Sequence, residues 1–186
     1  MDETTTPYEQ IESDLWTWMR EFVAIKNDFY GAKFPPCPFA QRALLQETVD
    51  VAVWRSGDVK GFVRERAENM RDTGTLTTRV MAFPPRIQRA WGVSEFVESL
   101  NRALVPDNVF LNTGLAKTTV SRYPGSNGSP YFIVVANSLD AVLKGSELLQ
   151  KSDYYQNWPK AHYQIVVERR ERMAKRYATK QEPDNF

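Results

Sequence analysis

Cys37 is the side chain whose type and position could support covalent chemistry. It is the only cysteine of the chain and lies between two prolines. Pro38 suits the first position of a helix, because the N–H that it lacks would be unpaired there, so we predict a helix over 38–46 with Cys37 as its N-cap. The free amides of that turn, together with Arg42 one turn later, would favour the reactive thiolate. Burial would reverse this effect, and a lone cysteine beside phenylalanines is more often a small buried apolar side chain.

His162 is the only histidine, and it lies near the start of the last predicted helix, beside Trp158 and Tyr163. The positive end of that helix would lower the pKa of the imidazole and favour its neutral form, which could act as a base. It could serve Cys37 only if the last helix folds back on the 37–45 segment. Cys37, Arg42 and His162 therefore form a candidate catalytic set. The alternative interpretation places His162 in a partly buried aromatic cluster.

The segment 123–128 has the densest turn signal in the chain. Consecutive backbone amides in a loop of this kind can bind an anion. The sequence lacks the G-x-x-x-x-G-K-[ST] and G-x-G-x-x-G patterns of nucleotide sites, so a simple hairpin connection is the alternative. If the loop is functional, it should lie close to Cys37. The candidate anion- or ligand-binding residues are Ser126, Asn127, Gly128, Ser129 and Tyr131.

Basic and aromatic residues could also form a surface for a partner. Two acidic residues dilute the basic cluster of the last helix, and helices commonly have basic residues near their C-terminal ends. An ordinary solvated helix face is therefore the alternative interpretation. The candidate contact residues are Arg169, Arg170, Arg172 and Trp158, and exposed aromatic side chains would extend the surface at Trp54, Trp91, Tyr154 and Tyr155.

The pattern of apolar residues predicts the elements that would position these side chains. β-Branched runs indicate strands, and apolar residues at three- and four-residue spacing indicate helices. Strand, helix and strand over 49–83 suggest a right-handed βαβ unit. We expect an α+β fold: a mixed open sheet of about four or five strands with helices packed against it, ferredoxin-like or a related α/β sandwich. Strands are predicted at 49–55, 76–83, 109–111, 118–123 and 130–136, the last of them central, and helices at 7–29, 38–46, 59–70, 94–106, 138–150 and 159–177.

Composition limits the classes of function. The 186 residues, 42% of them hydrophobic, fit one globular domain over 1–186 with frayed ends at 1–5 and 179–186. Because 24 basic residues nearly balance 23 acidic ones, the net charge argues against nucleic acid. One cysteine and one histidine exclude a disulfide framework and His-rich metal sites, and we expect no cofactor. Without a signal-like start or a long apolar run, we expect a soluble cytoplasmic protein with no membrane association. The sequence leaves open whether the protein binds another protein or a second copy of itself.

Two resemblances accompany these patterns. The segment CPFAQRALL, 37–45, resembles the active-site segment of omega-class glutathione transferases and dehydroascorbate reductases, where such a cysteine forms a mixed disulfide with glutathione. The proline and the acid–serine pair that bind glutathione in that family have no clear counterpart after Val49, so we attribute this local similarity to coincidence.

A second resemblance covers roughly residues 15–150. It rests on the CPFA motif, the strand end at Thr77–Pro84 and the Asn127–Tyr131 segment. Together they resemble an uncharacterised bacterial domain-of-unknown-function family. That family has a His-Pro segment where this chain has Ser121–Pro124, so no role of its histidine is inherited. The resemblance implies a fold and a motif set rather than an activity.

Two classes of function remain. A binding or assembly module that uses an aromatic and basic surface is favoured, because the sequence shows no complete set of nucleophile, base and orienting residue. The alternative is a small thiol-dependent enzyme or redox sensor that uses Cys37.

Overall fold

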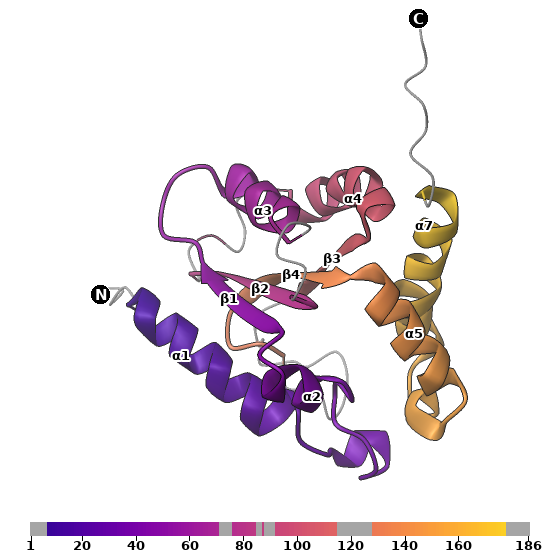
Figure 1. Cartoon of the computed structure of the whole chain (residues 1–186). Coiled ribbons are helices and arrows are strands. Elements are labelled where there is room, and N and C mark those ends of the chain that lie inside the picture. Colours follow the sequence, from indigo (N-terminus) through magenta and orange to yellow (C-terminus); the bar gives the residue numbers. More distant parts are fainter. Residues whose placement is uncertain (1–6, 71–75, 85–86, 88–91, 115–127, 178–186) are drawn as a thin grey trace, which may run out of the picture.

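The sheet is the framework on which the helices pack. The computed structural model describes residues 7–70, 76–84, 87, 92–114 and 128–177. Within these residues, four strands pair in the order β1-β2-β4-β3, with β1 parallel to β2 and the other two pairs antiparallel. The α+β class, the mixed open sheet and the central place of the 130–136 strand are confirmed (Figure 1). The strands are β1 (Val49–Val53), β2 (Thr78–Phe83), β3 (Val109–Gly114) and β4 (Phe132–Ser138).

One face of the sheet is covered by α3 (Val59–Glu68) and α4 (Val93–Leu104), which lie above it in Figure 1. Helix α3 connects two neighbouring parallel strands, as the βαβ prediction requires. Successive strand residues point to opposite faces, so Met81 and Phe83 of β2 share this face. They pack in one core cluster with residues of both helices, including Val63, Ala67, Val97 and Leu100.

Helix α4 also pairs with the backbone of the edge strand β3. The side chain of Asn101 is fully buried, accepts a hydrogen bond from the Leu111 N–H at 2.7 Å and donates one to the Leu111 carbonyl at 3.0 Å. An edge strand otherwise presents unpaired backbone groups. The amide of Asn101 satisfies two of them and fixes α4 against β3.

The opposite face is covered in part by the N-terminal helices. Helix α1 (Tyr8–Trp18) continues as a π-helical segment, η1 (Met19–Val23), and α2 (Ala40–Leu45) follows the 3-10 turn η2 (Asp28–Tyr30). These elements lie below the sheet in Figure 1, with α1 beside β1. An apolar stripe at four-residue spacing runs along α1 into η1 and consists of Ile11, Leu15 and Met19. It packs against residues of β2 and β4, namely Val80, Ala82 and Ile133.

The C-terminal helices stand at the other end of the sheet (Figure 1). Helix α5 (Leu139–Gln150) is capped by Ser138, whose hydroxyl accepts a hydrogen bond from the Ala141 N–H. For this helix, predicted at 138–150, the sequence allowed either Asn137 or Ser138 as the cap. After η5 (Asp153–Tyr155), the chain forms α6 (Lys160–Tyr163), the π-helical η6 (Gln164–Glu168) and α7 (Arg169–Tyr177), which together match the helix predicted at 159–177. A core cluster joins these helices to β3 and to the 3-10 turn η4 (Val105–Asp107) through Val105, Phe110, Leu139 and Met173.

The predicted helix over 7–29 is wrong at its end, because the helix stops at Val23. The Val23 carbonyl accepts a hydrogen bond from the Cys37 N–H at 3.1 Å. Phe29 and Tyr30 pack in a separate aromatic cluster instead of continuing the stripe of the first helix. The chain therefore turns away from the sheet after Val23.

One other helix start differs from the prediction. Helix α2 begins at Ala40 instead of Pro38, with Phe39 rather than Cys37 as its N-cap. Helix α4 begins at Val93, after Gly92 in the left-handed conformation at φ 43°, which agrees with an expected start at Ser94 or somewhat earlier.

From β1 to α5, the described strands and α-helices follow the order β-α-β-α-β-β-α, whereas the ferredoxin-like motif has β-α-β-β-α-β. Of the two expected alternatives, the fold is therefore the related α/β sandwich. The strand predicted at 118–123 and the frayed ends lie outside the described residues, and the single domain over 1–186 stays a prediction. No helix in the described part combines the length and the apolar character needed to cross a membrane.

Candidate functional site

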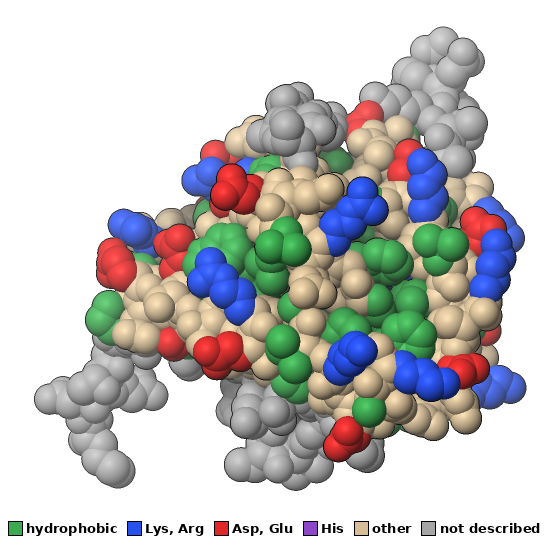
Figure 2. Space-filling view, turned by 60° about the horizontal axis from the view of Figure 1, so that its bottom comes forward, with side chains coloured by type: hydrophobic (Ala, Val, Ile, Leu, Met, Phe, Trp, Pro, Cys, Tyr) green, Lys and Arg blue, Asp and Glu red, His purple; other side chains and the backbone are tan. Residues whose placement is uncertain are grey.

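A cavity lies beneath the sheet, between the side formed by α1 and α2 and the side formed by α5 and α7. Its volume is about 390 Å³, which is within the range of pockets that hold small organic molecules. Figure 2 shows this face of the molecule, where hydrophobic side chains gather in a hollow to the right of the centre and basic side chains lie around them. The cavity is the candidate functional site.

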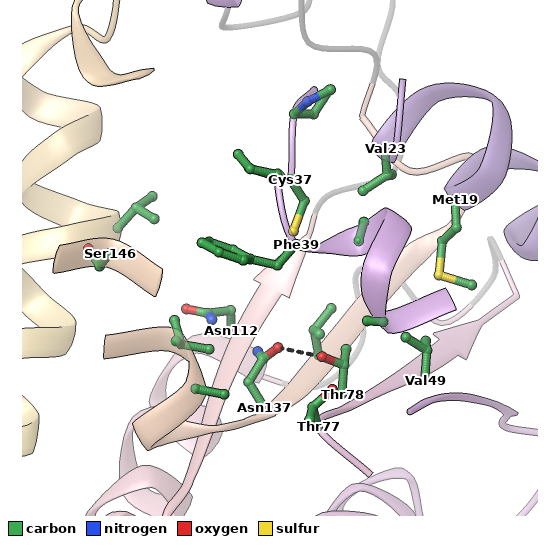
Figure 3. A pocket seen from close by; sticks show the side chains of 18 of the residues that line it. Met19, Val23, Cys37, Phe39, Val49, Thr77, Thr78, Asn112, Asn137 and Ser146 are labelled. Atoms are coloured by element: carbon green, nitrogen blue, oxygen red, sulfur yellow. Dashed lines mark hydrogen bonds between the residues drawn. The ribbon is translucent and has the colours of Figure 1, made fainter. Parts of the chain in front are cut away.

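The sheet forms the roof of the cavity. Val80 of β2 and Ile133 of β4 line it from the strand face that also contacts α1. Toward the start of β2 and the end of β4 the roof becomes polar. Thr78 Oγ1 donates a hydrogen bond to Asn137 Oδ1 at 3.2 Å, and Asn112 of β3 lines the same corner (Figure 3). The roof is therefore apolar with one polar corner.

The segment 36–40 forms one wall together with α2. It is held in place by the bond between the Cys37 N–H and the Val23 carbonyl, and by a hydrogen bond from the Tyr154 hydroxyl to the Pro36 carbonyl. Figure 3 shows the sulfur of Cys37 and the ring of Phe39 turned toward the cavity. The CPFA motif is thus a cavity wall.

Phe39 bridges the two sides of the cavity. Its ring reaches α5 at Gly145, where a Cβ would lie only 2.7 Å from Phe39 Cε2. Glycine is therefore required for this close approach. Because 41% of its surface is exposed, the ring separates the cavity from solvent.

Helix α5 forms the second wall, and aromatic residues close the outer end. The rings of Tyr30 and Tyr154 stack at 5.0 Å, which joins η2 to η5. Tyr155 and Trp158 meet edge to face, also at 5.0 Å. Such pairs are favourable beyond the area that they bury, and the pair of Tyr30 and Tyr154 joins the two sides of the cavity. The α5 residues that line it include Ala141, Val142, Ser146 and Leu149.

Arg170, near the start of α7, lines the cavity and has only 6% of its surface exposed. Burial lowers the pKa of its guanidinium group, whereas interactions with Tyr155 and Glu171 favour the charged form, and arginine stays protonated in proteins. Its Nε has no hydrogen-bond partner. Among the described residues, no carboxylate forms an ion pair with it. A buried charge of this kind costs several kcal/mol unless it is paired.

Two tryptophans of the cavity lining also have unpaired buried donors. The indole Nε1 atoms of Trp18 and Trp158 are buried, lack a hydrogen-bond partner and belong to residues that line the cavity. The hydroxyl groups of Ser146 and Tyr155 lie nearby as a pair, 3.2 Å apart. Leaving a buried donor unpaired costs about 1 to 3 kcal/mol. The cavity therefore combines apolar walls with donors that suit an acceptor group.

The structure does not bring the candidate catalytic set together. Burial raises the pKa of the Cys37 thiol, and the amides of Phe39 and Ala40 oppose that effect only in part. Arg42 is exposed and its Nε donates to Gln46 at 3.3 Å. The ring of His162 lies 4.3 Å from that of Trp158, and burial lowers the pKa of its imidazole. Neither Arg42 nor His162 lines the cavity.

The predicted anion-binding loop falls partly outside the described residues. Ser126 and Asn127 lie there, so the predicted closeness of the loop to Cys37 is untested. Of the described members, Ser129 is buried and its hydroxyl accepts a hydrogen bond from the Tyr131 N–H at 3.2 Å. The Tyr131 hydroxyl donates to Asp14 of α1 at 2.6 Å, and burial together with this carboxylate raises the pKa of Tyr131 to about 12. Gly128, Ser129 and Tyr131 do not line the cavity.

The predicted partner surface is wrong for three of its members, because Trp54, Tyr154 and Arg170 are buried. Arg169 pairs with Glu98 of α4, and Arg172 lies 3.6 Å from Glu168. The other aromatic members are Tyr155 and Trp158, which are half-buried in the cavity lining, and Trp91, which lies outside the described residues.

Comparison with known proteins assigns no family to the chain: no family model, curated protein or solved structure matches it. The resemblances of 15–150 and 37–45 therefore stay predictions. The function has to be inferred from the cavity.

The sequence contained a signal for the position of Arg170. It lies four residues after Val166 and three before Met173, so helical periodicity puts it on the apolar stripe of the last helix. The cavity as a whole has no such signal, because its walls come from distant parts of the chain. Pro36 and Tyr154, which bond across one wall, are separated by 118 residues.

Proposed function

We propose that the protein binds a small, mainly apolar organic molecule in the cavity beneath the sheet. The observation that supports this most strongly is a cavity of about 390 Å³ with apolar walls and a few unpaired donors. This composition is typical of ligand-binding pockets. The protein is then a binding module, the class favoured by the sequence, but its aromatic and basic residues line a pocket instead of an outer surface.

Two π-helical segments border the cavity and support the same proposal. Segment η1 contributes Met19 and Val23 to the walls, and η6 contributes Val166. Such segments are rare and occur frequently at functional sites. Trp18 directly precedes η1 and Arg170 lies in the first turn after η6. The helix irregularities therefore lie beside two cavity-lining residues that have unpaired donors.

The proposal is tested by the binding of an anilinonaphthalene fluorophore, whose emission increases in apolar surroundings. Ala43→Phe adds a ring inside the cavity and should weaken binding about tenfold or more, the equivalent of about 1.4 kcal/mol. Ala161→Phe adds the same ring at an exposed position of α6 outside the cavity and should leave binding unchanged. If Ala43→Phe unfolds like the wild type on heating and still binds equally well, the proposal is wrong.

A thiol-dependent activity of Cys37 is the second candidate, since its sulfur faces the same cavity (Figure 3). An electrophilic or oxidising ligand bound there would lie near the thiol. The raised pKa of the thiol disfavours this reading, because the thiolate is the nucleophile. Ligand binding without a covalent step is better supported.

A further inference from the structure

Arg170 points to a chemical class for the ligand, an inference that rests on the proposed function. We propose that the cavity binds a monocarboxylate with an apolar tail, and that its carboxylate pairs with the Arg170 guanidinium group. Among the described residues, no carboxylate forms an ion pair with this guanidinium group.

The geometry of the guanidinium group suits this anion. Arginine presents a planar fork of N–H donors that matches the two oxygens of a carboxylate. The side chain of Arg170 lines the cavity, and its Nε has no hydrogen-bond partner within the described part of the protein. The ligand would supply the acceptor that the protein does not.

The charge of the cavity favours a monoanion. Arg170 is the only charged side chain among the described lining residues. The two acids closest in sequence have other partners as well: Glu171 accepts a hydrogen bond from Gln150 Nε2 at 2.9 Å, and Glu168 lies 3.6 Å from Arg172. One positive charge balances one carboxylate, whereas a phosphate monoester carries about −1.5 to −2 at neutral pH and would bury excess negative charge.

Neutral donors around Arg170 complete the head-group site. The Tyr155 hydroxyl interacts with the guanidinium group and lies 3.2 Å from the Ser146 hydroxyl. The indole of Trp158 packs on Tyr155 and has an unpaired Nε1. A carboxylate has about four acceptor positions, so it can engage these donors as well as the guanidinium group.

The size of the cavity sets the length of the tail. At about 30 Å³ for each water-sized group, roughly a dozen non-hydrogen atoms fit. Octanoate, with about ten, is therefore a suitable probe. With its head group at Arg170, the tail extends beneath Ile133 and Val135 toward the opposite wall at Met19 and Leu44.

The test compares octanoate, 1-octanol, octylammonium and octyl phosphate by calorimetric titration of the full chain at pH 7. Octanoate should bind wild type about tenfold to a hundredfold more tightly than 1-octanol, the effect expected of hydrogen bonds to a charged group. Octylammonium should bind more weakly than 1-octanol, because it places a second cation beside Arg170. Octyl phosphate should bind more weakly than octanoate.

Three variants locate the head group. Arg170→Gln should remove the preference for octanoate and keep the binding of 1-octanol. Lys175→Gln removes one positive charge from an exposed position of the same helix and should keep the preference. Arg170→Lys retains the charge without the fork and should keep a reduced preference, which provides a decisive variant should Arg170→Gln not fold.

The outcomes separate this inference from the proposed function. Equal binding of octanoate and 1-octanol to wild type, or an octanoate preference that survives in Arg170→Gln, overturns the carboxylate inference and leaves the apolar pocket. Tighter binding of octyl phosphate than of octanoate also overturns it. Failure of all four probes to bind overturns both.

Discussion

The thiol of Cys37 is under two opposing influences. Burial raises its pKa, and the N–H groups of Phe39 and Ala40 favour the charged form. The prediction of amides near the sulfur was therefore useful although the helix begins later than expected, because the turn before α2 supplies them. The burial that outweighs them agrees with the alternative interpretation of a lone cysteine beside phenylalanines. The sequence did not indicate the wall of α5 and η5 that helps to form this environment.

Alkylation of native protein by iodoacetamide should have its pH midpoint above about 8.5, the ordinary thiol value. Burial raises the pKa of the Cys37 thiol in the folded state, so the thiolate forms only at higher pH. The stability that the protonated thiol contributes is complete below the ordinary pKa and is lost as the pH rises through the raised pKa of the folded state. Octanoate should slow the reaction, because it occupies the cavity that the sulfur faces.

Two reference reactions complete this measurement. Urea-unfolded protein should return to a midpoint near 8.5, and Cys37→Ser should not react. A native midpoint clearly below about 8 would contradict the burial argument and favour the thiol-dependent enzyme or redox sensor.

At the scale of elements, the spacing of apolar residues predicted the positions of the strands. The strands near 49, 78 and 132 and the cap of α5 at Ser138 follow from β-branched runs and a local hydrogen bond. The end of the first helix could not be predicted in this way. Phe29 and Tyr30 are apolar residues that follow the helix, but they pack on Tyr154 and Trp158 instead of on the sheet. Periodicity counts apolar residues, but it does not say which partner covers them.

The contact between Phe39 and Gly145 offers a test of how the two sides of the cavity are joined. Replacing glycine by alanine inside a helix usually stabilises it by about 1 kcal/mol. In Gly145→Ala the new Cβ would meet the Phe39 ring at 2.7 Å, so the gain should be lost or reversed. In a Phe39→Ala background the same substitution should give the full gain.

Urea denaturation of the wild type, both single variants and the double variant measures this coupling. A coupling free energy of about 1 kcal/mol or more is expected for residues in contact. Additive effects would mean that the ring of Phe39 does not rest on Gly145 in solution.

At the scale of the whole molecule, the sequence predicted the sheet and its layers but not the cavity. The cavity exists because α1 packs beside β1 and the C-terminal helices pack beside β3, which leaves part of one sheet face between them. No motif encodes that spacing. Arg170 was predicted as a surface residue because its neighbours Arg169 and Arg172 are basic, and its place on the apolar stripe was the better guide.

The most direct test of the central claim is a crystal structure of the protein with octanoate. The ligand should occupy the cavity with its carboxylate within about 3.2 Å of the Arg170 guanidinium nitrogens, the limit of an ordinary N–H···O hydrogen bond, and with its tail beneath Ile133. An empty cavity at a saturating concentration of octanoate, or octanoate bound only on the outer surface, would contradict it.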